Sequence, residues 1–149
     1  MLKSMITLTY SEPLFANYAF YVALITLKLI SMSALTSVVR LINMTFANEE
    51  DAAQFNKRIN LKDPLVERIR RAHLNDLENI PAFWIIGFLY TLSYPSVFIA
   101  TMCFRVYTVS RFIHTISYLF GIGRSRGMSY IVGLVVLIFM TLNVIVALI

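Results

Sequence analysis

The sequence is short of charge, cysteine, glycine and proline, and each shortage excludes a class of protein. Charged residues make up 14% of its 149 residues and hydrophobic residues 58%, whereas about a quarter of a soluble globular domain is charged. One cysteine, Cys103, excludes an intrachain disulfide framework and a cysteine metal cluster. Five glycines and four prolines are too few for a collagen-like or low-complexity chain. With a mean hydropathy of +0.72, the composition points to a membrane protein.

The excess of basic residues does not indicate a nucleic-acid partner. Thirteen Lys and Arg residues against eight Asp and Glu residues give a net charge of +5. The basic residues flank apolar segments, and the sequence has no zinc-finger, RRM or helix-turn-helix pattern. Basic residues beside membrane segments usually fix orientation instead. We therefore expect no nucleic-acid binding.

Long apolar runs predict membrane-spanning helices. Lys28 is the only charge in residues 13–39, and residues 79–104 and 127–149 have none. A span needs about 20 apolar residues. Pro95 lacks an amide donor and breaks the middle run with a turn. The sequence thus predicts an all-α membrane protein, a single domain over residues 1–149, as a four-transmembrane-helix bundle with helices at about 14–42, 64–93, 96–120 and 126–148.

Capping signals set two helix starts. The run 79–92 is too short to span, so the second long helix has to begin near Pro64, with Asp63 as its N-cap. Asn48 is in a position to cap a short helix in the preceding loop, since acidic residues follow it and oppose the helix dipole.

The distribution of basic residues predicts the orientation. Most of them outside the helices lie in the loop 43–63 and the turn 120–126, whereas Lys3 is the only basic residue on the opposite side. The positive-inside rule places the two basic connections in the cytosol and makes the first helix an uncleaved anchor. A sequon at residues 43–45 offers a test, because glycosylation there would mean the inverse orientation.

Polar side chains recur at helical spacing inside these segments. The second helix carries Arg68, Arg71, Asn75 and Glu78, and the third carries Tyr107, Arg111, His114 and Tyr118. Spacings of three and four residues place each set on one stripe. Arg40 closes the first helix, and Arg126 and Tyr130 open the fourth. Each could be a snorkelling arginine or an interhelical hydrogen bond. Together, at one depth, they favour a pocket for a small anion that carries its own ammonium group.

Other polar residues are interpreted as structural. Lys28 lies about 21 Å from the lumenal end of the first helix, and Asp76 lies about 27 Å from the lumenal end of the second. Because a lysine side chain can cover that difference, we predict a structural Lys28–Asp76 ion pair. No two-His or His/Glu set has the spacing of metal ligands, so we expect no metal.

Three segments resemble one known family. They are residues 40–41 with 46–51 (FANEED), 66–80 (VERIRRAHLNDLENI) and 111–118 (RFIHTISY). These resemble the MAPEG family of membrane proteins, closest to its microsomal glutathione transferase branch and next to its prostaglandin E synthase branch. The resemblance implies a homotrimer in the endoplasmic reticulum membrane, with the outer mitochondrial membrane as the alternative. It also implies glutathione bound between subunits near the cytosolic face.

The resemblance also assigns roles position by position. The positions that contact glutathione would be Arg40, Arg71, Asn75, Glu78, His114, Tyr118, Arg126 and Tyr130. Of these, we expect Arg126 to act catalytically by stabilising the thiolate of glutathione, since an arginine favours an adjacent anion. Asp51 matches an acidic position implicated in the prostaglandin branch. A catalytic role for Asp51 and a plain charge in the first turn of a helix are equal interpretations.

The activity implied is a membrane-bound glutathione transferase. It would join glutathione to lipophilic electrophiles from the bilayer and could also reduce lipid hydroperoxides. The first alternative is a prostaglandin E synthase-type isomerase, against which Leu74 and Gly127 argue, because that branch usually carries arginine and serine there. A non-enzymatic lipid-binding adaptor is opposed by the retained polar set. A channel subunit is opposed by the lack of a pore-like loop.

Overall fold

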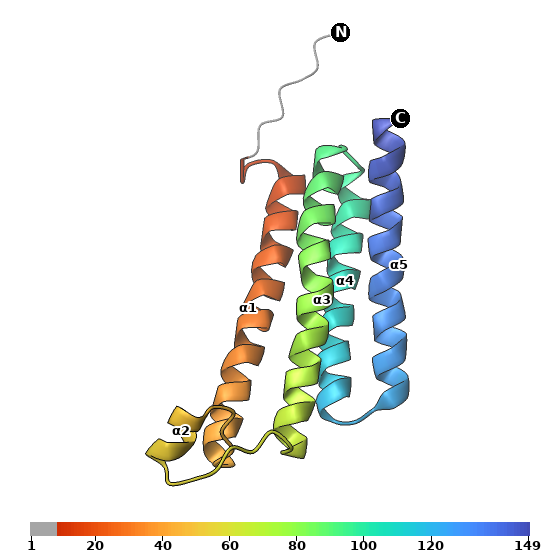
Figure 1. Ribbon diagram of the computed structural model, residues 1–149. Coiled ribbons are helices and arrows are strands. Elements are labelled where there is room, and N and C mark those ends of the chain that lie inside the picture. Colours follow the sequence, from red (N-terminus) through yellow and green to blue (C-terminus); the bar gives the residue numbers. More distant parts are fainter. Residues whose placement is uncertain (1–8) are drawn as a thin grey trace.

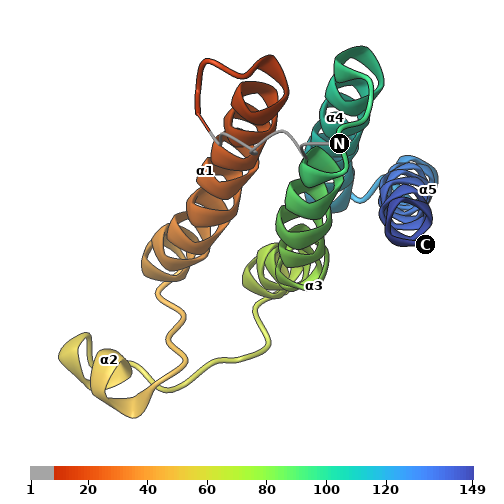
Figure 2. The ribbon, with the colours of Figure 1, turned by 90° about the horizontal axis from the view of Figure 1, so that it is seen from above.

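The computed structural model describes residues 9–149, and the prediction of an all-α chain is confirmed for that range. Its helices are α1 (Pro13–Ile42), α2 (Glu49–Gln54), α3 (Pro64–Leu92), α4 (Val97–Leu119) and α5 (Gly123–Leu148). The four long helices run along a common direction, and the short α2 lies at the end where α1 stops and α3 begins (Figures 1 and 2). Lys3 lies outside the described residues.

The two predicted capping sites have different outcomes. α3 begins at Pro64, and two backbone amides of its first turn donate to Asp63 Oδ1 at 3.1 and 2.9 Å, so the Asp63 cap is confirmed. The Asn48 cap is wrong in its chemistry. α2 does begin after Asn48, but the Asn48 side-chain amide donates to Asp51 Oδ2 at 3.1 Å and caps no backbone group.

Two tight turns connect the long helices. Tyr94 has a positive φ of 53° directly before Pro95, where the sequence predicts the break between α3 and α4. The second turn uses Gly121 with φ 73°, where a Cβ atom would lie 2.8 Å from Arg68 Nη1. Glycine tolerates both this conformation and this approach. Because the turn closes so tightly, α5 begins at Gly123, three residues before the predicted start.

The apolar core fills the half of the bundle that lies away from α2. Phe83 of α3 stacks on Tyr107 of α4 with ring centroids 4.3 Å apart, and both side chains are buried. α1 lies close to α3 at Gly87, where a Cβ atom would be 3.0 Å from the Tyr18 ring. Polar and charged side chains are thereby left to the half of the bundle nearer α2, and the candidate site lies there.

The exposed surfaces of α1 and α5 are apolar. α1 and α5 are long and apolar enough to cross a membrane, with mean hydropathies of 1.9 and 2.9 over their most apolar windows. Only 22% and 17% of those windows are buried within the chain. A core helix of a soluble protein would bury its apolar side chains, so these two helices need another apolar environment.

Candidate functional site

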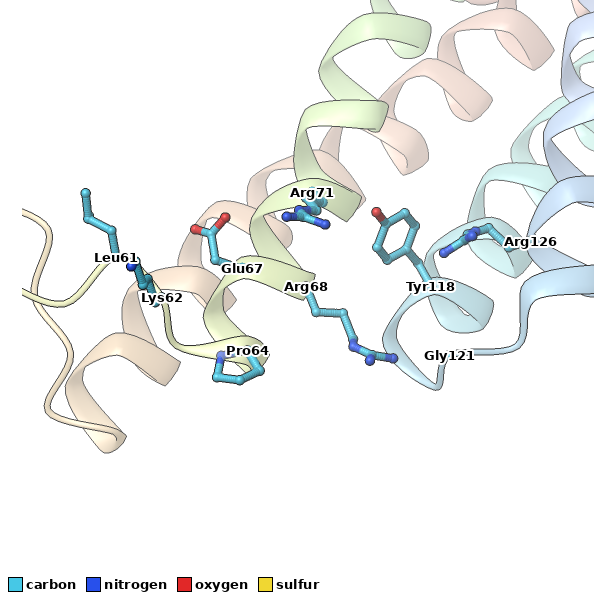
Figure 3. A pocket seen from close by; sticks show the side chains of 9 residues that line it. All are labelled: Leu61, Lys62, Pro64, Glu67, Arg68, Arg71, Tyr118, Gly121 and Arg126. Atoms are coloured by element: carbon cyan, nitrogen blue, oxygen red, sulfur yellow. The ribbon is translucent and has the colours of Figure 1, made fainter.

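A cavity of about 630 Å³ opens at the α2 end of the bundle, between α3, α4 and the start of α5. We call it the cationic pocket. It is lined by Leu61, Lys62, Pro64, Glu67, Arg68, Arg71, Tyr118, Gly121 and Arg126. Figure 3 shows Tyr118 between Arg71 on one side and Arg126 on the other. The pocket therefore gathers side chains from three helices and one loop.

The charges of this pocket suit an anion. Four of its lining residues are cationic and only Glu67 is acidic. Arg70, outside the pocket, donates to both Glu67 carboxylate oxygens at 2.8 Å. These hydrogen bonds lower the pKa of Glu67, which lies in the polar first turn of α3. Because Glu67 is already engaged, most of the positive charge of the pocket is left for a ligand.

Arg126 is held by aromatic side chains. Its Cζ atom lies 4.7 Å from the centroid of the Tyr118 ring, a cation–π geometry. His114 lies 5.9 Å from Tyr118 and 6.5 Å from Tyr130 between ring centroids. Among residues 9–149, no acidic side chain forms an ion pair with Arg126. The guanidinium is thus positioned by a neutral ring, which leaves its charge available.

Asn75 and Arg111 belong to a buried cluster below this pocket. Arg111 Nη2 donates to Asn75 Oδ1 at 2.6 Å and to Asp76 Oδ1 at 2.7 Å. Lys28 also donates to Asp76, so the predicted Lys28–Asp76 pair is confirmed. Thr115 donates to the same carboxylate at 3.3 Å. The grouping of Arg111 with the anion-binding stripe is therefore wrong, because its guanidinium is engaged by side chains of α3.

Arg40 and Asp51 line a different cavity. It has a volume of about 490 Å³, lies between the end of α1 and α2, and shares no residue with the cationic pocket. One nitrogen of Arg40, Nη1, is buried without a hydrogen-bond partner there. Arg40 and Asp51 therefore do not share a pocket with Arg126 of the same chain.

The predicted glutathione positions thus separate into groups. Arg71, Tyr118 and Arg126 line the cationic pocket, and His114 and Tyr130 lie beside Tyr118. Glu78 is exposed on the outer face of α3. Asn75, Arg40 and Asp51 lie elsewhere, as described above.

Two charged lining residues were missed by the sequence analysis. Lys62 comes from the loop before α3, and Glu67 lies four residues before Arg71 on α3. The signal for Lys62 was the concentration of basic residues in its loop. The signal for Glu67 was its spacing of four residues from Arg71, the same spacing that defines the stripe. Within residues 9–149, no group of three or more His, Cys, Asp or Glu side chains is placed to hold a metal ion.

Comparison with known proteins identifies the family of this chain. The model of the MAPEG family matches residues 18–146. Mouse (Mus musculus) "Microsomal glutathione S-transferase 1" is 46% identical over 119 residues, covering 76% of this chain and 77% of the relative. The human (Homo sapiens) protein of that name is 42% identical over 134 residues, 86% of each chain.

Relatives that are named for a different activity also match. Human "Prostaglandin E synthase" is 38% identical over 114 residues, which cover 76% of this chain and 75% of the relative. The identity to both kinds of relative exceeds what a shared fold alone would explain, and the family model spans most of the chain. The chain therefore belongs to the MAPEG family.

Proposed function

We propose that this protein is a membrane-bound glutathione transferase that joins glutathione to lipophilic electrophiles. The observation that carries the proposal is Arg126, a guanidinium on an aromatic ring at the edge of a pocket with three further cations. Support comes from relatives named microsomal glutathione S-transferase 1 at 42–46% identity over most of the chain. A lipophilic second substrate concentrates in the bilayer, which gives a physical reason for a membrane location.

Glutathione has the groups that such a pocket would bind. It carries two carboxylates, one ammonium and one thiol. A guanidinium binds a carboxylate with two parallel hydrogen bonds, so Arg68 and Arg71 suit the carboxylates. Glu78, exposed on the same face of α3 as Arg71, suits the ammonium. Asn75 would contact the peptide through its side-chain nitrogen, since its side-chain oxygen accepts from Arg111.

Arg126 would act on the thiol. A thiol of pKa about 8.5 is only a few per cent ionised at pH 7, and lowering that pKa by about two units needs roughly 2.7 kcal/mol of selective thiolate stabilisation. One arginine in a poorly solvated site supplies that amount. The thiolate sulfur then attacks the electrophilic carbon, the S–C bond forms, and the leaving group departs with its electron pair. The thiol proton passes to solvent.

The site would be completed in a homotrimer. Arg71 and Glu78 are exposed on a face of α3 that also exposes Leu74, Ile85 and Leu89. Charged side chains facing lipid are costly, whereas a second subunit can cover this face and use its charges. The same assembly would bring Arg40 and Asp51 of one subunit to the cationic pocket of the next. On this proposal Asp51 acts on the reaction in the neighbouring site.

The location we propose is the endoplasmic reticulum membrane, with all four long helices spanning it and the cationic pocket facing the cytosol. The basic residues at the α2 end support this orientation. Asn43 of the sequon donates to Asp63 at 3.2 Å, and Thr45 is buried. Expressed in cells, the protein should show no shift on glycosidase treatment. A glycan at Asn43 would place this end in the lumen.

The decisive experiment is glutathione binding by the purified protein in detergent. Calorimetry should detect binding at millimolar glutathione or below, and ultraviolet absorbance should report a bound thiolate at pH 7. Conjugation of an aromatic halide should then exceed isomerisation of a prostaglandin endoperoxide. Binding without conjugation, but with isomerisation, would favour the prostaglandin E synthase-type activity suggested by relatives at 37–41% identity. Absence of glutathione binding would leave a non-enzymatic lipid-binding adaptor.

A further inference from the structure

A second cavity of about 630 Å³ lies between α4 and α5, and it shares no lining residue with the cationic pocket. We call it the outer groove. The surface that its walls expose is almost wholly apolar, although two arginines and three serines also line it. The apolar side chains that form the walls are Val106, Val109, Ile113, Ile122, Met128 and Val132. All six are exposed, so the groove opens to the outside of the bundle.

The arginines of α4 and α5, the two helices that form this groove, have no acidic residue on either helix to pair with. Residues 79–149 contain four arginines and no acidic residue. Arg111 is paired with Asp76 of α3, and Arg126 lies on Tyr118. Arg105 donates from Nε to the Tyr21 hydroxyl at 3.0 Å.

Arg105 and Arg124 both line the outer groove, and Arg124 is the one for which none of these contacts accounts. The ion pairs of residues 9–149 do not include it. Arg124 is exposed, so its charge is free to pair with an anionic group of another molecule that also suits the apolar walls beside the arginine.

The groove has the length and position of a lipid that occupies one leaflet of the bilayer. Arg124 is the second residue of α5, and Val132 lies eight residues further, about 12 Å along the helix. α5 is about 39 Å long against a hydrocarbon core of about 30 Å, so its first turn extends into the headgroup region. Along the groove, Arg124 lies at headgroup depth and the apolar side chains lie below it, with Arg105 of α4 at the deep end held by the Tyr21 hydroxyl.

We propose that the outer groove binds an acyl chain of a phospholipid whose anionic headgroup pairs with Arg124. The apolar walls bury methylene groups of the chain, and the arginine selects a headgroup with net negative charge. A second copy of the chain fits less well. Its exposed acidic segment, α2, is a polar helix of six residues and cannot fill an apolar slot of this length.

The headgroup can be tested by native mass spectrometry of the purified oligomer. The protein in detergent is offered equal amounts of phosphatidylglycerol and phosphatidylcholine with identical acyl chains. The wild type should retain phosphatidylglycerol about fivefold more than phosphatidylcholine, the preference expected from one arginine at the membrane surface. Arg124→Gln should abolish that preference. Arg58→Gln, which removes the same charge from the loop before α3, should keep it.

The groove itself is tested by filling it. Val109→Trp and Met128→Trp each place a bulky ring on one wall, at exposed positions where folding tolerates it. Both should lower the retention of either lipid, whereas Ile131→Trp, exposed on α5 outside the groove, should not. Equal retention of the two lipids by the wild type, or unchanged retention in the groove variants, would overturn the proposal. Dissociation of the oligomer by Val109→Trp with lipid still bound would instead make the groove a subunit contact.

Discussion

Arg111 Nη2 lies 2.7 Å from Asp76 Oδ1, and both side chains are buried between α3 and α4. The other oxygen of this carboxylate accepts from Lys28 of α1. One carboxylate therefore joins three helices and is the acidic partner of two buried cations. Its removal would leave both cations without an acidic partner in the bundle.

Asp76→Asn should therefore destabilise the protein strongly. Breaking a buried ion pair by removing one partner costs about 3–5 kcal/mol, because an uncompensated charge stays buried. Thermal unfolding of the purified protein in detergent should show a large fall in midpoint. Glu67→Gln, which breaks the exposed Glu67–Arg70 pair, is the control and should change the midpoint little. Similar midpoints for the two variants would contradict the structural role of Asp76.

Arg126→Ala should strongly reduce the bound thiolate at pH 7 without disrupting the oligomer. If the arginine lowers the thiol pKa by about two units, its loss reduces the thiolate fraction at pH 7 roughly 25-fold. The direction of the pH dependence follows from the lowered thiol pKa. The deficit should be large at pH 7 and shrink as pH rises past the unperturbed thiol pKa, so the rates of variant and wild type converge near pH 9.

The measurement for Arg126 is a pH–rate profile for conjugation, with thiolate absorbance and subunit number as companions. Arg58→Ala, a cation in the loop before α3, is the matched control and should behave as wild type. An Arg126→Ala profile parallel to that of the wild type at every pH would remove thiol ionisation from the role of this arginine.

Two substitutions of Tyr118 distinguish a role for its aromatic ring from a role for its hydroxyl group. Its ring lies under the Arg126 guanidinium, and such an interaction is worth about 0.5–2 kcal/mol. Tyr118→Phe keeps the ring and should retain most of the activity, whereas Tyr118→Ala should lose roughly 2- to 30-fold in kcat/KM. If the phenylalanine variant is as impaired as the alanine variant, the hydroxyl rather than the ring is what matters.

Mixed oligomers test whether the site is shared. Arg40 lies in the α1–α2 cavity and Arg126 in the cationic pocket of the same chain. If Arg40 of one subunit serves Arg126 of the next, coexpressed Arg40→Ala and Arg126→Ala subunits should form some intact sites and recover part of the activity. Each variant expressed alone is the control. No recovery in oligomers that mass spectrometry shows to be mixed would mean that both arginines act within one subunit.

Several features could be predicted from the sequence because they depend on one helix at a time. The Asp63 cap and the Pro64 start of α3 follow from residue chemistry at a helix end. The Lys28–Asp76 pair followed from counting rises along two helices, since a helix advances a fixed 1.5 Å per residue. The stripe that carries Arg71 followed from the 3.6-residue period.

The partners of these stripes were decided only by the tertiary structure. Periodicity fixes which side chains of a helix share a face, but not how far that helix is rotated toward its neighbours. The packing of α4 against α3 brings Arg111 to Asp76, although spacing grouped it with His114 and Tyr118. A long arginine side chain reaches across such a difference, so its partner depends on packing. For the same reason, the separation of Arg40 from the cationic pocket was visible only once α1 and α2 were in place.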